Sequence, residues 1–266
     1  MIVDGRAIAS RILKEAREAG EVFGRPLVVD VISVSPSPAT ESYLKIKTAR
    51  AKDAGMELRV TKLSASSTEE EIRIAVQGAK GDAVIVQLPL PQALDTKRVL
   101  DAIPQEKDAD VLSSISQQAF LETDEGLIPP VALAVLEILQ VSGVDPKGKS
   151  VAVIGQGMLV GRPVSILLTR LGAKVDAFDK DDDYRERLKN YEIIISGAGV
   201  PGLIQPEMIQ KGAVIIDAGT SESHGAIVGD ANPSCSEKAS VFTPVPGGVG
   251  PVTVACLFKN VVRLAK

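Results

Sequence analysis

The chain has 266 residues, of which 45% are hydrophobic and 24% charged, and its formal net charge is −4. This composition is typical of a globular protein, and the slightly acidic balance disfavours a nucleic-acid partner. No apolar run is long enough to span a membrane, and charges interrupt the first residues where a secretion signal would be apolar. We therefore expect a soluble cytoplasmic protein with no nucleic-acid or membrane partner.

The residue types that usually bind transition metals are scarce. Cys235 and Cys256 are the two cysteines, and His224 is the single histidine. Their spacing matches neither a disulfide framework nor a zinc site, and we expect no metal. The cysteines are predicted to be small buried groups, and the histidine to have a surface or structural role.

In the first third of the chain, short apolar strands alternate with helical segments. Strands are expected at residues 26–34, 57–63 and 83–88, with helices at residues 39–55 and 68–80. Near-continuous apolar strands separated by helices are typical of parallel sheets covered on both faces.

The alternation restarts near residue 150. A glycine-rich turn and a helix over about 160–171 follow the first strand of this series, and an apolar helix opened by two prolines, 127–141, joins the two series. A further helix is expected after Gly250. The strands are expected at residues 151–155, 174–178, 192–197 and 213–219. The predicted fold is α/β, with two lobes, each a mostly parallel sheet flanked by helices, and a cleft between them.

Two glycine-rich motifs call for different interpretations. Residues 143–150 match the P-loop pattern, but a helix precedes them and a strand follows, which is the reverse of a P-loop and favours a turn. Gly155, Gly157 and Gly161 follow a strand and open a helix, the context of a dinucleotide-binding loop. A tight structural turn is the alternative, because the spacing is GxGxxxG.

The end of the next strand bears on the choice of dinucleotide. Asp179 stands where an acidic side chain would bond a ribose 2′-hydroxyl, as in NAD. Lys180 and Arg162 could instead accept a 2′-phosphate, as in NADP. Residues 179–183 are also consistent with a solvated turn that binds nothing.

Three further features are candidates for a binding site. Residues 245–251 hold three glycines and two prolines, which favours a loop of fixed bends that approaches a flat ligand. Tyr43 and Lys47 are four residues apart and share one face of a predicted helix, although a surface pair would look the same. Gln87 ends a strand, where functional groups gather in parallel sheets.

Taken together, these segments are similar to the bifunctional methylenetetrahydrofolate dehydrogenase/cyclohydrolase family. The similarity runs through nearly the whole chain in the family's order. The matching motifs are Asp4-Gly5, Tyr43-x-x-x-Lys47, VQLPLP at 86–91, KDAD at 107–110, GQGMLVGRP at 155–163, DAG at 217–219, GD at 229–230 and TPVPGGVGP at 243–251.

This resemblance implies a substrate domain formed by residues 1–126 and 252–266, and a Rossmann-like dinucleotide domain formed by residues 127–251, in a homodimer. It implies oxidation of 5,10-methylenetetrahydrofolate with NADP and hydrolysis of the methenyl product to 10-formyltetrahydrofolate, in one-carbon metabolism and purine synthesis. The alternatives are a dehydrogenase alone, a non-catalytic dinucleotide-binding regulator, and a two-lobed dehydrogenase acting on an acid or amino acid.

The resemblance also implies roles for individual residues. Lys47 matches the catalytic lysine, with Gln87 bonded to it. Tyr43 would stack on the aminobenzoyl ring of the folate, and Asp110 would bind the pterin and join the catalytic set. The remaining implied contacts are Pro246, Gly247 and Gly248 for the substrate, and Gly155, Gln156, Gly157, Gly161, Arg162, Asp179, Lys180 and Thr220 for the cofactor.

This chain departs from the family's pattern at three of these places. Gln156 stands where the family usually has an arginine, and Asp179-Lys180 where it has a His-Ser pair. Asp179 favours NAD, Lys180 favours NADP, and the family's habit favours NADP. Val111 stands where the family usually has glycine, so we expect the loop that carries Asp110 to bend differently.

Overall fold

The computed structural model describes residues 1–123, 126–179, 181–223 and 226–265. The chain divides into two compact units. Unit 1 combines Met1–Ala9 with Val131–Thr253, and unit 2 combines Ser10–Pro130 with Val254–Lys266. Both units are α/β, as the sequence predicts. Among the described residues, no helix is both long and apolar enough to cross a membrane.

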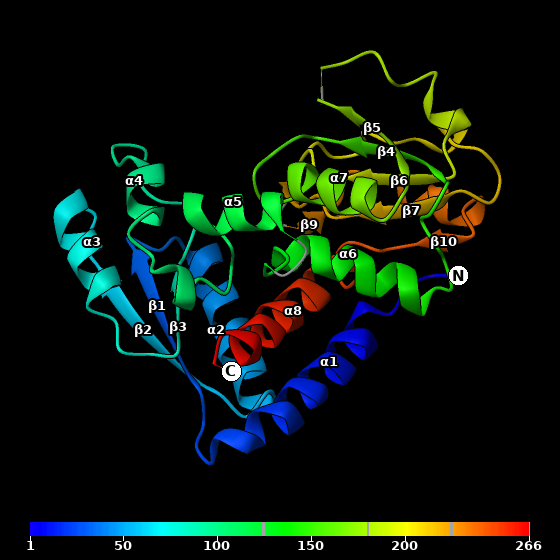
Figure 1. Cartoon of the computed structure of the whole chain (residues 1–266). Coiled ribbons are helices and arrows are strands. Elements are labelled where there is room, and N and C mark those ends of the chain that lie inside the picture. Colours follow the sequence, from blue (N-terminus) through cyan, green and yellow to red (C-terminus); the bar gives the residue numbers. More distant parts are fainter. Residues whose placement is uncertain (124–125, 180, 224–225, 266) are drawn as a thin grey trace. The chain divides into compact units, whose positions relative to one another are not determined.

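Unit 2 contains a three-stranded parallel sheet in the order β2-β1-β3 (Figure 1). The strands are β1 (Val28–Val34), β2 (Glu57–Leu63) and β3 (Ala83–Val86), close to their predicted positions. Parallel neighbours need a crossover connection, which α2 (Pro38–Asp53) and α3 (Glu69–Gln77) provide. The helix α2 contacts β2, and α3 contacts β1.

Local sequence explains where these two helices begin. Ser37 caps α2 by accepting from the backbone N–H of Thr40, with proline in the first turn. Thr68 and Glu71 form a reciprocal capping box at the start of α3. The buried residues of α2 are Leu44, Lys47 and Ala51. This spacing of three and four residues places Lys47 on the helix face that packs inward.

Several elements lie outside the sequence prediction. They are α1 (Gly5–Gly20), α4 (Thr96–Leu100), α5 (Ser114–Glu122), β8 (Ser221–Ser223), β9 (Ala226–Val228) and β10 (Val241–Phe242), with the 3₁₀ turns η1 (Glu21–Phe23), η2 (Gln105–Lys107), η3 (Leu188–Asn190), η4 (Pro206–Met208) and η5 (Pro233–Glu237). A signal for α1 was available, because its buried Ile8, Ile12 and Ala16 recur at helical spacing.

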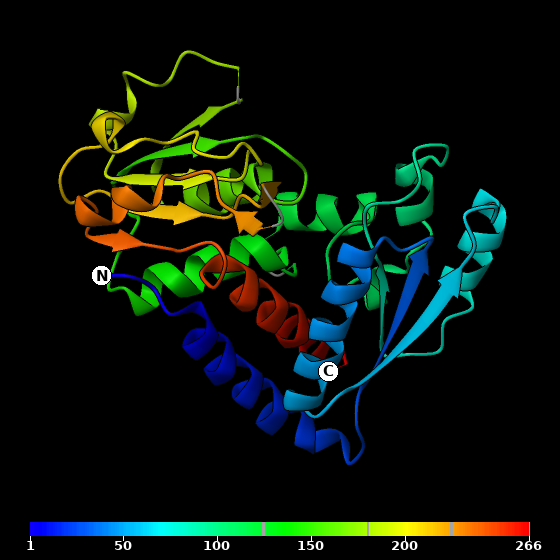
Figure 2. The ribbon, with the colours of Figure 1, turned by 180° about the vertical axis from the view of Figure 1, so that it is seen from behind.

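Unit 1 contains a five-stranded parallel sheet in the order β10-β7-β6-β4-β5 (Figures 1 and 2). Beyond β10, its strands are β4 (Ser150–Ile154), β5 (Lys174–Phe178), β6 (Ile193–Ser196) and β7 (Val214–Asp217), with α7 (Gly161–Arg170) between β4 and β5. The direction of winding reverses at β4, so the carboxyl end of β4 is a topological switch point. Ligands of doubly wound sheets bind at such points.

The first residues of the chain belong to this sheet's edge. Val3 donates a backbone hydrogen bond to Phe242 of β10, and the terminal amine of Met1 donates to the Ser240 carbonyl at 2.6 Å. Both views show the N-terminus beside β10 (Figures 1 and 2). Asp4 then caps α1 by accepting from the N–H groups of Arg6 and Ala7.

Two further helices are predicted correctly: α6 (Pro130–Val141), opened by proline, and α8 (Val249–Leu264) at the end of the chain. Residues 143–150 form a turn leading into β4, as expected. Cys235 and Cys256 are fully buried free thiols, which confirms their predicted burial. His224 lies outside the described residues.

Candidate functional site

The centre of the candidate site is a buried amine–amide pair in unit 2. Lys47, on α2, is 5% exposed, and Gln87, directly after β3, is 8% exposed. The Nζ atom of Lys47 donates to Oε1 of Gln87 at 3.0 Å. The Nε2 atom of Gln87 donates to the Leu88 carbonyl at 2.7 Å, so the oxygen of this amide is the atom that faces the lysine.

Tyr43 lies one turn before Lys47 on the same helix. The lysine Nζ is 5.1 Å from the centroid of the tyrosine ring, within the range of a cation–π contact. The residue is 37% exposed, so part of its ring surface remains open to a ligand. Burial and the charge of Asp110 raise the pKa of Tyr43 to about 12, which keeps the phenol neutral.

Asp110 is the acidic member of the site. Burial lowers the pKa of Lys47, and the charge of Asp110 partly opposes that shift. Burial also raises the pKa of Asp110, which the lysine opposes and Asp108 reinforces. Desolvation therefore drives both groups toward their neutral forms. The structure brings together all four of Tyr43, Lys47, Gln87 and Asp110, from α2, the end of β3 and the loop before α5.

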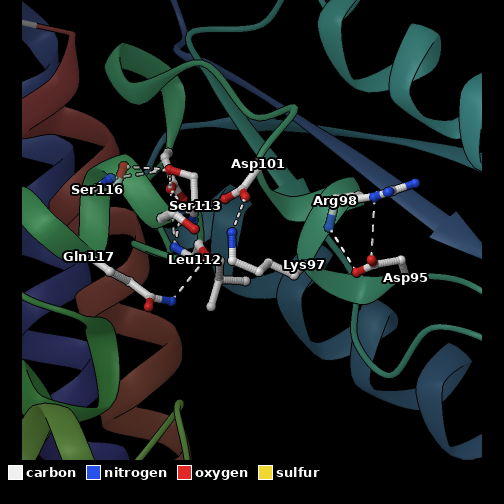
Figure 3. Close-up of polar contacts among 10 residues, drawn as sticks. Asp95, Lys97, Arg98, Asp101, Leu112, Ser113, Ser116 and Gln117 are labelled. Carbon is white, nitrogen blue, oxygen red and sulfur yellow. Dashed lines mark hydrogen bonds and ion pairs between the residues drawn. The ribbon is translucent and has the colours of Figure 1, made fainter.

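Hydrogen bonds hold that loop on its C-terminal side. The carboxylate of Asp108, which is fully buried, accepts from the N–H groups of Leu112 and Ser113 at 3.1 and 2.8 Å. It also accepts from the Ser113 hydroxyl at 2.6 Å. Ser113 in turn caps α5, and Figure 3 shows it beside Ser116 at the start of that helix. The residues flanking Asp110 are thus tied to the helix that follows.

A second set of bonds ties α4 to α5. Asp101, at the end of α4, accepts from the backbone N–H of Ser114 at 2.7 Å and forms an ion pair with Lys97 at 2.7 Å (Figure 3). This ion pair is exposed and contributes little energy by itself. The backbone bond to Ser114 fixes where α5 begins.

Val111 answers the expectation of a differently bent loop. Its φ is +57°, in the left-handed region that glycine favours and β-branched residues avoid. The valine therefore adopts the backbone conformation that a glycine would adopt, and the replacement has not removed it. The valine side chain is 3% exposed, so its burial offsets the backbone strain.

In unit 1, the glycines after β4 have distinct structural roles. Gly155 has φ +84°, and a Cβ there would lie 2.7 Å from the Cα of Ala198. A Cβ at Gly161 would lie 1.8 Å from the Gly155 carbonyl oxygen. A Cβ at Gly157 would meet nothing within 4 Å, so open space lies above that part of the loop. Two glycines therefore serve close packing, and the third leaves room for a ligand.

Gln156 folds back onto its own unit. Its Nε2 donates to the Val153 carbonyl at 3.0 Å, and its Oε1 accepts from the Ser165 hydroxyl at 3.3 Å. The side chain thus braces the turn between β4 and α7. The backbone of Gln156 is the part that a bound dinucleotide would meet.

The other predicted cofactor residues of this unit are solvent-exposed. Arg162 is in the first turn of α7, Asp179 follows β5 and Thr220 follows β7. The N–H of Asp179 donates to the carboxylate of Asp182 at 2.6 Å, forming a turn. Lys180 lies outside the described residues.

Two buried carboxylates were quoted in sequence motifs without a role. Asp217, at the end of β7, is 2% exposed and accepts from the N–H groups of Gly219 and Ala231. Asp230 is fully buried and accepts from the N–H groups of residues 198–200 and from the Ser196 hydroxyl. Together they organise the loops after β6 and β7. Burial raises the pKa of Asp217 to about 6.

Neighbouring glycines could have revealed this pair. A Cβ at Gly219 would lie 2.2 Å from the carboxyl carbon of Asp230, and a Cβ at Gly229 would lie 2.1 Å from an oxygen of Asp217. Each carboxylate therefore needs the glycine beside the other one. The DAG and GD motifs are the sequence signal of this arrangement.

The glycine-rich loop after β10 explains the Asp4-Gly5 motif. The N–H of Gly5 donates to the Gly247 carbonyl at 3.1 Å, and a Cβ on Gly5 would lie 1.9 Å from the Gly248 carbonyl oxygen. Gly247 itself has φ +110°. Pro246, Gly247 and Gly248 belong to unit 1, whereas the four residues around Lys47 belong to unit 2.

Comparisons with known proteins cover almost the whole chain. Residues 3–110 match the family model "Tetrahydrofolate dehydrogenase/cyclohydrolase, catalytic domain", and residues 129–266 match "Tetrahydrofolate dehydrogenase/cyclohydrolase, NAD(P)-binding domain". The chain is 37% identical to "Bifunctional protein FolD" of Mycoplasmopsis synoviae over 277 residues, covering 100% of this chain and 99% of that protein.

Solved structures are similar over the same extent. The bifunctional FolD enzyme of Campylobacter jejuni has a TM-score of 0.95 at 30% identity, covering 100% of this chain and 98% of that one. The FolD enzyme of Trypanosoma brucei, solved with NADP cofactor and an inhibitor, has a TM-score of 0.93 at 33% identity, covering 100% and 97%.

Proposed function

The chain belongs to the tetrahydrofolate dehydrogenase/cyclohydrolase family, and from that premise we propose that it oxidises 5,10-methylenetetrahydrofolate with NADP and hydrolyses the product to 10-formyltetrahydrofolate. The observation that carries this proposal is the buried Lys47–Gln87 pair beside Tyr43 and Asp110. A dinucleotide-binding regulator would have no use for a desolvated lysine held by an amide.

The loop after β4 and the first turn of α7 suit a dinucleotide. The positive φ of Gly155 and the open space at Gly157 support backbone approach to a pyrophosphate. When bound, NADP supplies the acceptor for the hydride that leaves the methylene carbon. Arg162, an exposed cation in that first turn, would accept the 2′-phosphate together with Lys180. Asp179 and Thr220 would bound the ribose side of the site.

For the oxidation step, the chain's own contribution is positioning. Tyr43 would stack on the aminobenzoyl ring, for which its partly exposed ring is suited. Asp110 would accept from adjacent N–H donors of the pterin, and Pro246, Gly247 and Gly248 would line the folate pocket. No acid or base is needed for hydride departure, because the methenyl cation is resonance-stabilised.

For the hydrolysis step, Lys47 would act as the proton carrier. Water adds to the methenyl carbon, and the neutral amine of Lys47 removes a proton from the added water. The resulting ammonium returns a proton to N5 as the carbon–N5 bond breaks, which leaves the formyl group on N10. Burial favours the neutral amine that this role needs, and Gln87 accepts from Nζ and so fixes the direction of the lysine.

The test is an assay of the purified protein with 5,10-methylenetetrahydrofolate that follows reduced nicotinamide and methenyl product separately, once with NADP and once with NAD. We expect reduction with NADP and little accumulation of methenyl product. Reduction with accumulating methenyl product would establish the alternative, a dehydrogenase alone. No reduction with either cofactor would contradict the proposed function.

The finer organisation is also proposed from the resemblance. We assign the substrate role to residues 1–126 and 252–266 and the dinucleotide role to residues 127–251, with substrate held between the two, in a cytoplasmic homodimer. Light scattering on the eluate of a sizing column measures the oligomeric state directly, and a monomer mass would contradict this assignment.

A further inference from the structure

One side chain of α8 touches the loop that carries Asp110. Asn260 is fully buried, and its Nδ2 donates to the Ala109 carbonyl at 3.0 Å. The same Nδ2 donates to the Ile128 carbonyl at 2.9 Å. Both N–H groups of one amide are therefore committed to backbone oxygens far away in the sequence. All of these residues lie in unit 2.

The Ala109 carbonyl belongs to the peptide group that leads into Asp110. On the other side of Asp110, the buried carboxylate of Asp108 holds the N–H groups of Leu112 and Ser113. Asp110 thus stands between two fixed points, with Val111 in a strained left-handed conformation next to it. A strained segment persists only where its surroundings over-determine it, and Asn260 is one of those surroundings.

The buried amide carries a penalty that simple packing would avoid. Its Oδ1 has no hydrogen-bond partner among the described residues, and a buried acceptor without a partner is destabilising. An apolar residue would remove that unsatisfied atom from the core of α8. What an apolar residue cannot supply is the pair of N–H donors that holds the Ala109 and Ile128 carbonyls.

We propose that Asn260 is a positioning residue for Asp110, holding the Ala109–Asp110 peptide so that the carboxylate meets the pterin of the folate. This inference rests on the proposed function, because Asp110 has that role only if a folate is the substrate. Asn260 itself touches neither substrate nor cofactor in this scheme. It acts through the backbone of the loop.

The test compares Asn260→Leu and the smaller Asn260→Ser with a matched control, Val261→Ala. Val261 is the next residue of α8 and is also fully buried, so its truncation weakens packing without touching the Ala109 carbonyl. We expect both Asn260 variants to raise the KM for 5,10-methylenetetrahydrofolate about tenfold, the scale of one lost hydrogen bond. The KM for NADP and the kcat at saturating folate should stay within about twofold. The control should lower thermal stability and leave the folate KM unchanged.

A double-variant measurement separates positioning from general destabilisation. If Asn260 acts through the carboxylate, Asn260→Ser adds no further rise in folate KM to Asp110→Asn, because the group that it positions is already gone. A full multiplicative effect in the double variant would overturn the proposal. So would a folate KM in the Asn260 variants that matches the Val261→Ala control.

The wild-type protein distinguishes this failure from failure of the proposed function. A wild type that does not turn over 5,10-methylenetetrahydrofolate overturns both. An active wild type whose Asn260 variants behave like the control overturns the positioning role alone.

Discussion

The Nζ atom of Lys47 and the Oε1 atom of Gln87 are 3.0 Å apart inside unit 2, joined by a hydrogen bond that neither residue shares with water. An amide accepts from a lysine without carrying a charge of its own. It therefore orients the amine without stabilising the ammonium form as a carboxylate would. This distinction leads to the first two predictions.

Replacing Lys47 with methionine keeps the volume of the side chain and removes the amine. We expect methenyl hydrolysis to be abolished, and hydride transfer to retain much more of its rate, because only the hydrolysis needs a proton carrier. The measurement is the rate of each step with its own substrate. Lys45→Met, on the exposed face of the same helix, should leave both rates near wild type. Equal loss of both steps in Lys47→Met would contradict this division of roles.

Replacing Gln87 with glutamate places a carboxylate where the amide oxygen lies. The negative charge favours the ammonium form, so the pKa of Lys47 should rise from its lowered value. Because the neutral amine is the base, the pH profile of methenyl hydrolysis should shift to higher pH, and the rate at neutral pH should fall. A profile that stays in place or moves to lower pH would exclude the base role of Lys47.

Val111 offers a test of backbone strain that separates it from burial. Val111→Gly and Val111→Ala both lose buried methyl groups, so both should destabilise the fold. At φ +57°, however, glycine should be more stable than alanine by about 1 kcal/mol, since only alanine retains the strain. Val76, buried in α3, is the control, where glycine should be less stable than alanine. Chemical denaturation of the four variants gives both orders, and the same order at both sites would refute the strain.

Asp217 should make stability depend on pH in an unusual direction. Its folded-state pKa is about 6, against an ordinary value of 3.8, so the folded protein binds this proton more tightly than the unfolded chain does. The group therefore destabilises the fold fully above about pH 6, and this cost fades as pH falls toward about 4. A shift of this size corresponds to about 3 kcal/mol at most.

The comparison is with Asp217→Asn, which cannot titrate. Other carboxylates, such as Asp82 with its lowered pKa, act in the opposite direction in both proteins and cancel in the difference. The wild-type free energy of unfolding should therefore gain on that of the variant as pH falls from about 7 to about 4. A difference that is constant with pH would show that Asp217 does not titrate in this range.

Gly5 and Gly20 stand at the two ends of α1 and should respond oppositely to alanine. A Cβ on Gly5 would overlap the Gly248 carbonyl oxygen at 1.9 Å, whereas a Cβ on Gly20 would meet nothing within 4 Å. Gly5→Ala should lower the melting temperature and disturb the loop after β10. Gly20→Ala should raise stability by about 0.5 kcal/mol, because alanine has less freedom in the unfolded chain. Two variants of equal stability would mean that the close approach at Gly5 is relieved elsewhere at no cost.

The sequence by itself determined the alternation of strands and helices in both units, because apolar period and glycine position are local properties that each segment carries alone. It also determined the family, since motifs such as VQLPLP and TPVPGGVGP are contiguous. The four residues around Lys47 were assigned by that resemblance. Spacing alone left Tyr43 and Lys47 no different from a surface pair.

Only the tertiary structure decided which of these groups are desolvated and what holds them. Burial of Lys47 depends on α2 packing inward, and the Lys47–Gln87 bond joins residues 40 apart in the chain. The contact from Asn260 to Ala109 spans 151 residues, and the mutual fit of the Asp217 and Asp230 carboxylates requires two loops from different strands. Charge and hydrogen-bond energies depend on distance and on exclusion of water, and neither is defined until the chain has folded.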